Sequence, residues 1–230
     1  MLISVNPILK CFLLLLQNFK IYDRILNIKI TKTGIAMNVY DFDKTIYDGD
    51  STEDFIIMCL KKQPRLIFRF MRCGISFAAY RTGLVSKTAF KEVMYRFLRD
   101  IDDIDDYVQE FWDSHIKKIK KFYIANQKAD DVIISASPEF LLRDVCQRLG
   151  IKHLIASKID KYTGCCLGIN CFGEEKVRRF YTEYSSEHGG IPQIDEFYSD
   201  SLSDTPLAKL AKHAYIVVGE DTVPWNAKNL

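Results

Sequence analysis

The sequence has no strong excess of charge of either sign, no Cys-x-x-Cys pair and no apolar run long enough to cross a bilayer. The formal net charge is +2 over 230 residues, so composition gives no support to nucleic-acid binding. The seven cysteines are an odd number without paired spacing, which argues against a zinc site or a disulfide framework. A reduced, cytoplasmic globular protein is the interpretation that fits.

The first 36 residues differ in texture from the rest of the chain. Their apolar run, residues 8–16, is too short to span a membrane. No small-residue cleavage site follows it, which argues against a signal peptide. We interpret residues 1–36 as an N-terminal extension with a mis-assigned start codon, and Met37 as the natural start. The alternative is an amphipathic segment that lies on a membrane surface.

Two carboxylates directly follow an apolar segment near residue 40. Met37 to Tyr40 predicts a short buried strand, and Asp41 and Asp43 come next. Carboxylates at an apolar strand end need compensation, which a divalent metal usually provides. An aspartate in this position can attack phosphorus, and a second one can transfer the proton. Taken alone, the pattern is also typical of a solvated turn.

Three later segments place polar groups where a predicted strand ends or a predicted helix begins. A strand over 132–135 ends at Ser135, and Ser137 is expected to cap the helix that follows, with Pro138 at its first position. Lys176 lies in the first turn of another predicted helix, where a cation opposes the helix dipole. A strand over 196–199 is followed by Asp200 and Asp204. Taken singly, Ser135 could be a buried hydroxyl, Lys176 a surface lysine, and the aspartates a helix cap.

These four segments, in this order, resemble motifs I to IV of the haloacid dehalogenase superfamily of phosphohydrolases, in the branch that looks like phosphoserine phosphatase. The resemblance covers the chain from about Met37 to the C-terminus. It implies that Asp41 is the nucleophile, which carries an aspartyl phosphate, and that Asp43 is the general acid and then the base. It also implies that Ser135 and Lys176 bind the phosphate.

The same resemblance implies a magnesium site. Asp41, Asp200 and the backbone carbonyl of Asp43 are expected to bind the ion, and Asp204 to hold a metal-bound water or to fix Lys176. Asp50 falls where phosphoserine phosphatases place an acidic residue, usually glutamate, near the substrate amine.

The chain departs from the family pattern at two positions. Lys44 stands where a small residue is frequent, and Ser199 where a glycine is frequent. Neither departure removes a catalytic group.

The order of predicted elements indicates an α/β fold with a Rossmann-like parallel sheet core and helices on both faces. Residues 37–50 and 125–230 are expected to form this core, and residues 51–124 an α-helical cap inserted after the first strand. The last elements predicted are a helix over 206–213 and a strand over 215–218. Ligands of such sheets bind beyond the carboxyl ends of the strands, where all four motifs lie.

The function predicted is a magnesium-dependent phosphatase that hydrolyses a phosphomonoester of a small metabolite. One alternative is a lipid-phosphate phosphatase at the membrane surface, because Arg65, Arg69 and Arg72 fall on one helical stripe. Membrane contact is not favoured, however, and no nucleic-acid partner is expected. Another alternative is a non-catalytic binding protein on the same fold. Basic residues dominate the stretch 51–99, so we expect substrates with a second anionic group, with Lys87 and Lys91 as candidate contacts.

Overall fold

The computed structural model describes residues 36–184 and 193–226. The extension predicted over residues 1–36 therefore lies outside the described residues, except for its last residue. Within the described part the chain forms a six-stranded sheet with the strand order β3-β2-β1-β4-β5-β6. Its strands are β1 (Ala36–Tyr40), β2 (Val132–Pro138), β3 (His153–Ser157), β4 (Gln193–Ser199), β5 (Ala211–Val218) and β6 (Asp221–Pro224).

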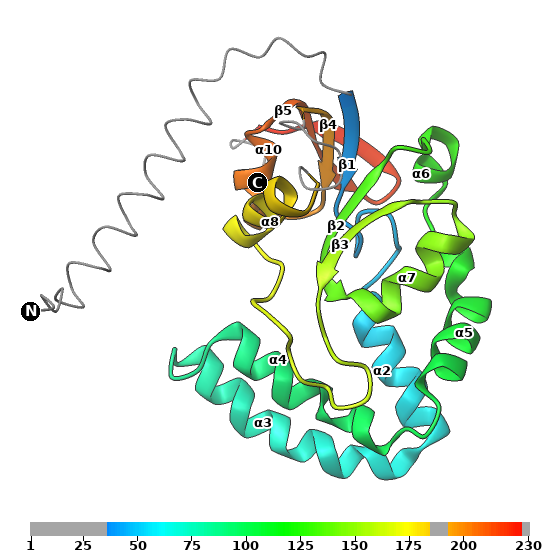
Figure 1. The fold of residues 1–230 in the computed structure, drawn as a ribbon, viewed down its shortest axis with the longest axis vertical. Coiled ribbons are helices and arrows are strands. Elements are labelled where there is room, and N and C mark those ends of the chain that lie inside the picture. The colour runs from blue at the N-terminus through cyan, green and yellow to red at the C-terminus, as the bar shows by residue number, and fades with distance from the viewer. Residues whose placement is uncertain (1–35, 185–192, 227–230) are drawn as a thin grey trace, which may run out of the picture. The chain divides into compact units, whose positions relative to one another are not determined.

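Strand β1 lies at the centre of the sheet (Figure 1). It pairs in parallel with β2 and β4, so that Tyr40 stands opposite Ile133 on one side and Tyr198 on the other. The pairs β2–β3 and β4–β5 are also parallel, and only β6 runs antiparallel, against β5. The carboxyl ends of five strands therefore point to the same edge of the sheet.

Apolar side chains cover both faces of the sheet. Val39 belongs to one buried cluster and Tyr40 to another, as the alternation of side chains along a strand requires. The Val39 cluster includes Phe180 and Leu207, whereas the Tyr40 cluster includes Trp112. Burial on both faces accords with the continuous apolar run at residues 132–134 of β2.

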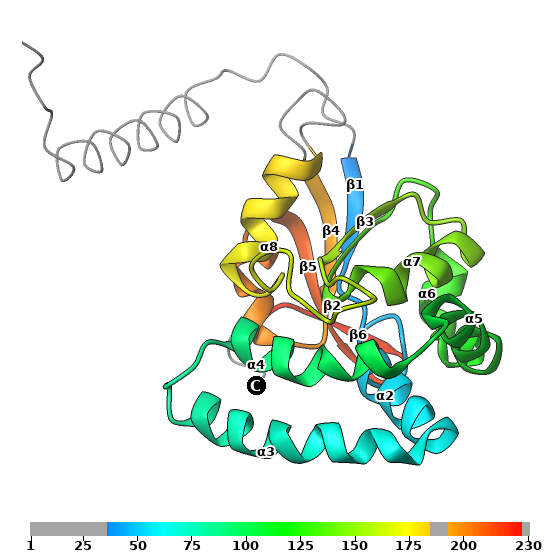
Figure 2. The same ribbon diagram turned by 60° about the horizontal axis from the view of Figure 1, so that its bottom comes forward.

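Helices fill the chain between β1 and β2. They are α2 (Ser51–Lys62), α3 (Ile67–Arg81), α4 (Lys87–Tyr95), α5 (Ile104–His115) and α6 (Lys121–Asn126), joined in part by short 3₁₀ turns. Helices α3 and α4 pack against each other beyond the carboxyl ends of the strands (Figures 1 and 2). Helix α5 instead packs on α7 (Glu139–Arg148), and Trp112 donates a hydrogen bond from Nε1 to the carbonyl oxygen of Leu141 at 2.7 Å.

The remaining helices lie near the end of the chain. Helix α8 (Glu174–Arg179) continues into a π-helical turn, Phe180–Tyr184, and α10 (Thr205–Ala208) follows β4. The helix predicted over 206–213 is wrong beyond Ala208, because β5 begins at Ala211 and pairs along its length with β4. No helix in the described ranges combines the length and the hydropathy of a membrane span.

Candidate active site

One cavity of about 970 Å³ gathers the residues predicted from the four motifs. It lies where β1, β2 and β4 end. Every predicted site residue lines it: Asp41, Asp43, Asp50, Ser135, Lys176, Asp200 and Asp204. Segments up to about 160 residues apart in sequence meet here because the parallel strands end at one edge of the sheet.

Lys176 joins two of these carboxylates. Its Nζ lies 2.7 Å from Asp41 Oδ1 and 2.7 Å from Asp204 Oδ2, and the residue is only 2% exposed. The hydroxyl of Ser199 donates a further hydrogen bond to Asp204 Oδ2 at 2.8 Å. The serine that departs from the family pattern thus takes part in orienting Asp204.

The charges of this group do not cancel. Burial alone would lower the pKa of Lys176, but Asp41 and Asp204 outweigh it and raise that pKa, so the ammonium group stays charged. Burial raises the pKa of Asp41, and Lys176 offsets this only in part. When both carboxylates are ionised they share one ammonium group, and one negative charge remains for another cation to neutralise.

The first turn of α8 brings Lys176 into the cavity. Gly173 precedes the helix with a φ of 58° and accepts a hydrogen bond from the Lys176 amide at 3.0 Å. A glycine suits this left-handed conformation because it has no Cβ. The unfavourable position of a lysine near the positive end of the helix is compensated by its two buried carboxylate partners.

Asp43 is fixed by two segments of the chain. Its Oδ1 accepts a hydrogen bond from the Ser51 amide, at the start of α2, at 2.7 Å, and its Oδ2 accepts one from the Ser137 hydroxyl. Burial raises the pKa of Asp43, helped by the nearby charge of Asp50, whereas these hydrogen bonds lower it. A carboxyl group with a raised pKa is suited to proton transfer.

The connection between β2 and α7 differs from its prediction. Helix α7 begins at Glu139, and its N-cap is Pro138, which makes no side-chain capping bond. Strand β2 continues to Pro138, which pairs with Ser157, so Ser137 is not a helix cap and its hydroxyl is free to donate to Asp43. Ser135 is buried, and its Oγ accepts a hydrogen bond from the Ser137 amide at 3.1 Å.

Asp200 lies at the end of β4, next to motif I. Its amide donates a hydrogen bond to Thr45 Oγ1 at 2.9 Å. Burial raises the pKa of the Asp200 carboxyl, and the charge of Lys44 lowers it. Thr45 is completely buried. The sequence indicates its contact with Asp200 only through its position directly after Asp43 and Lys44.

Asp50 has a structural task that does not depend on any substrate. It is the N-cap of α2, and its Oδ1 accepts a hydrogen bond from the Glu53 amide at 2.9 Å. Such a cap typically stabilises a helix by about 1 kcal/mol. The residue also lines the cavity, so Asp50 can both cap α2 and contact a substrate.

The donors in the cavity fit magnesium better than a transition metal. Among the described residues, no three His, Cys, Asp or Glu side chains are grouped so that they could hold a metal. Lys176 engages Asp204 and one oxygen of Asp41. Asp41, Asp200 and the Asp43 carbonyl remain, all of them oxygen donors. Magnesium is commonly bound by one or two carboxylates together with water and substrate phosphate, so this set and its uncompensated charge suit the ion.

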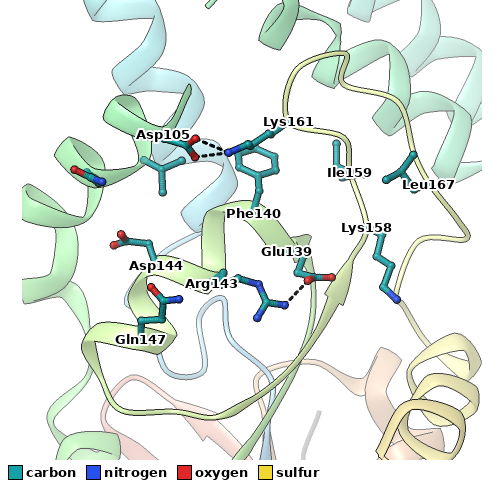
Figure 3. A pocket seen from close by; sticks show the side chains of 12 residues that line it. Asp105, Glu139, Phe140, Arg143, Asp144, Gln147, Lys158, Ile159, Lys161 and Leu167 are labelled. Carbon is teal, nitrogen blue, oxygen red and sulfur yellow. Dashed lines mark hydrogen bonds and ion pairs between the residues drawn. The ribbon is translucent and has the colours of Figure 1, made fainter. Parts of the chain in front are cut away.

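A second cavity, of about 550 Å³, lies between α5, α7 and the segment after β3. Figure 3 shows two ion pairs at its wall, between Lys161 and Asp105 and between Arg143 and Glu139. None of the predicted site residues lines it. The residues with predicted chemical roles therefore lie in the first cavity.

Comparison with known proteins identifies the family. The family model for haloacid dehalogenase-like hydrolases matches residues 39–209. The chain belongs to this family. A histidinol-phosphatase of Neisseria meningitidis serogroup C (strain 8013) is 24% identical over 204 residues, which cover 78% of this chain and 88% of the relative. A probable phosphatase of Mycobacterium tuberculosis (strain ATCC 25618 / H37Rv) is 33% identical over 93 residues, only 38% of this chain and 31% of that protein.

Solved structures share the fold of this haloacid dehalogenase-like hydrolase. A protein of unknown function from Bordetella pertussis Tohama I has a TM-score of 0.66 at 21% identity, covering 79% of this chain and 89% of the other. A substrate-bound phosphoserine phosphatase has a TM-score of 0.50 at 12% identity, covering 80% and 86%. The predicted family and α/β fold are confirmed, as is the predicted class of enzyme at the level of a hydrolase related to phosphatases. The roles of individual residues stay predictions.

Proposed function

We propose that this chain is a magnesium-dependent phosphatase that hydrolyses a phosphomonoester of a small metabolite through an aspartyl phosphate. One observation carries the proposal: the buried contact of Lys176 with Asp41, at 2.7 Å, in a cavity that Asp43 and Asp200 also line. A carboxylate held by a buried cation, with a second carboxyl group nearby, suits nucleophilic attack coupled to proton transfer.

The first step transfers the phosphoryl group to the protein. Ser135 and Lys176 bind phosphate oxygens, and a carboxylate oxygen of Asp41 attacks phosphorus. The bond from phosphorus to the ester oxygen breaks, and Asp43 gives its proton to the departing alcohol. Lys176 fixes the orientation of Asp41 before the attack, so little reorganisation is needed.

The second step releases the phosphate. Asp43, now deprotonated, takes a proton from water, and the water oxygen attacks the phosphorus of the aspartyl phosphate. The bond to the Asp41 oxygen breaks, and Asp43 is protonated again for the next cycle. The hydrogen bonds from the Ser51 amide and the Ser137 hydroxyl hold Asp43 in place through both steps.

Asp41, Asp200 and the carbonyl of Asp43 would hold the magnesium ion. When bound, it supplies positive charge that neutralises the phosphate and these carboxylates. Asp204 would act through Lys176, which it contacts directly.

We also propose a division of the described chain into a core and a cap. Of the predicted core, residues 37–50 and 125–230, the structure describes 37–50, 125–184 and 193–226. Helices α3 and α4 form the part of the cap that lies beyond the strand ends (Figure 2). Helices α2 and α5 would join the cap to the core, because Phe55 and Phe111 belong to the same buried cluster as Tyr40.

The alternatives are less well supported. Both carboxylate oxygens of Asp100 accept hydrogen bonds from Arg69, at 2.6 and 2.8 Å, which neutralises part of the basic stripe on which a lipid-phosphate substrate would depend. The side chain of Arg72 lies outside the described residues. A non-catalytic binding protein would not need the complete set of Asp41, Asp43 and Asp200 in one cavity. The cytoplasmic location stays a prediction.

Turnover of a generic aryl phosphate, with and without magnesium, tests the proposal. Asp41→Asn should lower kcat by roughly a thousandfold or more, because an amide cannot attack phosphorus. The matched control is Asp48→Asn, an exposed residue of the same loop outside the cavity, which should keep wild-type activity. Turnover by Asp41→Asn close to that of the control would refute the nucleophile assignment.

Identifying the physiological substrate requires activity measurements on a wider panel of phosphate esters. The names of the relatives suggest phosphoserine and histidinol phosphate, and the panel should include both, with sugar phosphates and lipid phosphates in micelles. A lipid phosphate as the best substrate would favour the membrane-surface alternative.

A further inference from the structure

The cavity that holds the motif residues has a second, chemically different wall. Apolar side chains from three helices between β1 and β2 form it. They are Ile56 and Ile57 of α2, Phe77 and Tyr80 of α3, and Phe90 and Met94 of α4. The motif residues that line the cavity lie at the strand ends, and α3 and α4 lie beyond those ends (Figures 1 and 2). A phosphate at Asp41 would therefore have its alcohol group directed toward the apolar wall.

The aromatic part of this wall is ordered by ring contacts. The Phe90 ring centroid lies 5.6 Å from that of Tyr80, with the planes 13° apart, and 5.6 Å from that of Phe77, with the planes 56° apart. These separations are in the range of favourable aromatic pairs. The rings thus form a preformed apolar surface.

This surface remains open to solvent in part. Phe77 is 48% exposed and Ile57 is 41% exposed. Large apolar side chains that line a cavity without being buried are typical of ligand-binding sites. A bound apolar group would remove this area from water, which is favourable in proportion to the area covered.

The basic residues that dominate the sequence from 51 to 99 do not form the apolar wall of this cavity. Of those whose side chains are described between Ser51 and Arg99, only Lys91 lines the cavity, and its Nζ donates to the Ala136 carbonyl at 2.7 Å. Lys62 and Arg69 pair with Glu110 and Asp100. The side chain of Lys87 lies outside the described residues. This distribution does not favour the expected preference for a second anionic group.

We propose that the apolar wall selects phosphomonoesters whose alcohol carries an aromatic or other ring-sized apolar group, in preference to compact polar esters. The inference rests on the proposed phosphatase function and assigns its substrate class. Phe77, Tyr80 and Phe90 are the specificity-determining residues, and they act by contact with the part of the substrate that does not react.

The test compares two esters with the same reacting group. In 2-phenylethyl phosphate and ethyl phosphate the phosphate is attached to a primary alkyl alcohol, so the difference in kcat/KM reports on the ring. We expect 2-phenylethyl phosphate to be preferred by roughly 10- to 100-fold, the discrimination typical of an apolar pocket. Phosphoserine should also be a poorer substrate than the phenylethyl ester.

A matched pair of variants locates the effect. Phe77→Ala should reduce the preference by at least about threefold, mainly through KM of the phenylethyl ester, because the ring contact contributes to binding. The control is Phe68→Ala on the same helix. Phe68 is 70% exposed and does not line the cavity, so its variant should keep the wild-type ratio of the two esters.

The possible outcomes separate the two proposals. Equal kcat/KM for the two esters, or a higher value for ethyl phosphate, would overturn the apolar-wall inference and leave the phosphatase proposal intact. So would a Phe77→Ala variant that lowers kcat/KM of both esters equally. Absence of turnover of both esters and of an aryl phosphate, by folded protein with magnesium, would instead overturn the phosphatase proposal.

Discussion

Asp131→Asn should stabilise the protein at neutral pH. Asp131 is completely buried just before β2, where its Oδ2 accepts a hydrogen bond from the Lys128 amide at 2.9 Å. Its Oδ1 is buried, and the hydroxyl of Tyr123 interacts with this carboxyl and lowers its pKa. Burial raises the pKa of this carboxyl from 3.8 to about 6, the Lys128 amide partly offsets the rise, and the charge of Asp130 adds to it.

The sign and size of the effect follow from this shift. Because the pKa of Asp131 is higher in the folded state, the folded protein binds the proton more tightly than the unfolded chain. Protonation of Asp131 therefore contributes to the free energy of unfolding. This contribution is fully present below about pH 4 and is lost as the pH rises through about 6. A shift of about two units corresponds to about 3 kcal/mol. Asparagine resembles the protonated acid and stays neutral at all pH values. The variant should therefore keep most of the stability that the wild type loses when Asp131 ionises.

Urea unfolding of wild type and variant at pH 4 and pH 7.5 measures the difference. We expect similar free energies of unfolding at the lower pH, and an Asp131→Asn variant more stable by roughly 2–3 kcal/mol at the higher pH. Asp102→Asn, at an exposed aspartate, is the control and should show no such change. A variant less stable than wild type at pH 7.5, or a difference that does not vary with pH, would refute the reasoning.

Three further predictions concern the site and the extension. Lys176→Met should lower the free energy of unfolding by about 3–5 kcal/mol and end turnover, since Asp41 and Asp204 lose their buried partner; an unchanged urea midpoint would contradict this. Asp200→Ala should weaken magnesium binding, measured by calorimetry without substrate, by roughly tenfold or more, and wild-type affinity would exclude Asp200 as a ligand. A chain that starts at Met37 should fold and turn over like the full chain, and insolubility of that shorter chain would show that residues 1–36 are structural.

The position of the candidate site was predictable because it depends on few rules. Each motif follows a strand or begins a helix, and parallel strands bring their carboxyl ends to one edge of the sheet. Asp41 and Asp200 are 159 positions apart in the sequence, yet both line one cavity because β1 and β4 are neighbours. Local patterns and this rule of topology predicted that the residues meet at one edge of the sheet, and the resemblance to the haloacid dehalogenase superfamily predicted their roles.

Contacts that depend on tertiary structure were not predictable in the same way. Ser137 precedes a proline, which is a typical start of a helix, but pairing of Pro138 with Ser157 keeps this stretch in the sheet. The helix predicted over 206–213 fails for the same reason, since pairing with β4 outweighs local helix preference. Charge counts in the helical stretch likewise did not show which side chains face the cavity and which form ion pairs on the surface.

Hydrogen bonds join the loop between β1 and α2 to residues near the end of the helical stretch. Lys44 has a φ of 58°, a conformation that costs a residue other than glycine about 1 kcal/mol or more. Its amide donates to the Gly49 carbonyl at 2.8 Å, and its own carbonyl accepts a hydrogen bond from Lys120 Nζ. Lys120 is itself buried, and its amide donates to the Ile46 carbonyl at 2.8 Å.

Residues 118–120, which precede α6, therefore contact the loop that follows the predicted nucleophile Asp41. The Asp48 amide bonds to the Lys118 carbonyl at 2.8 Å, next to the Lys120 contacts. With its backbone held in this conformation, Lys44 lines the cavity, and its charge lowers the pKa of Asp200. The departure from the family pattern at Lys44 thus adds a cation beside a predicted magnesium ligand. Because Lys120 contacts the Lys44 carbonyl from outside the cavity, we expect the geometry of Asp41 and Asp43 to depend on how the helical stretch 51–124 is joined to the sheet.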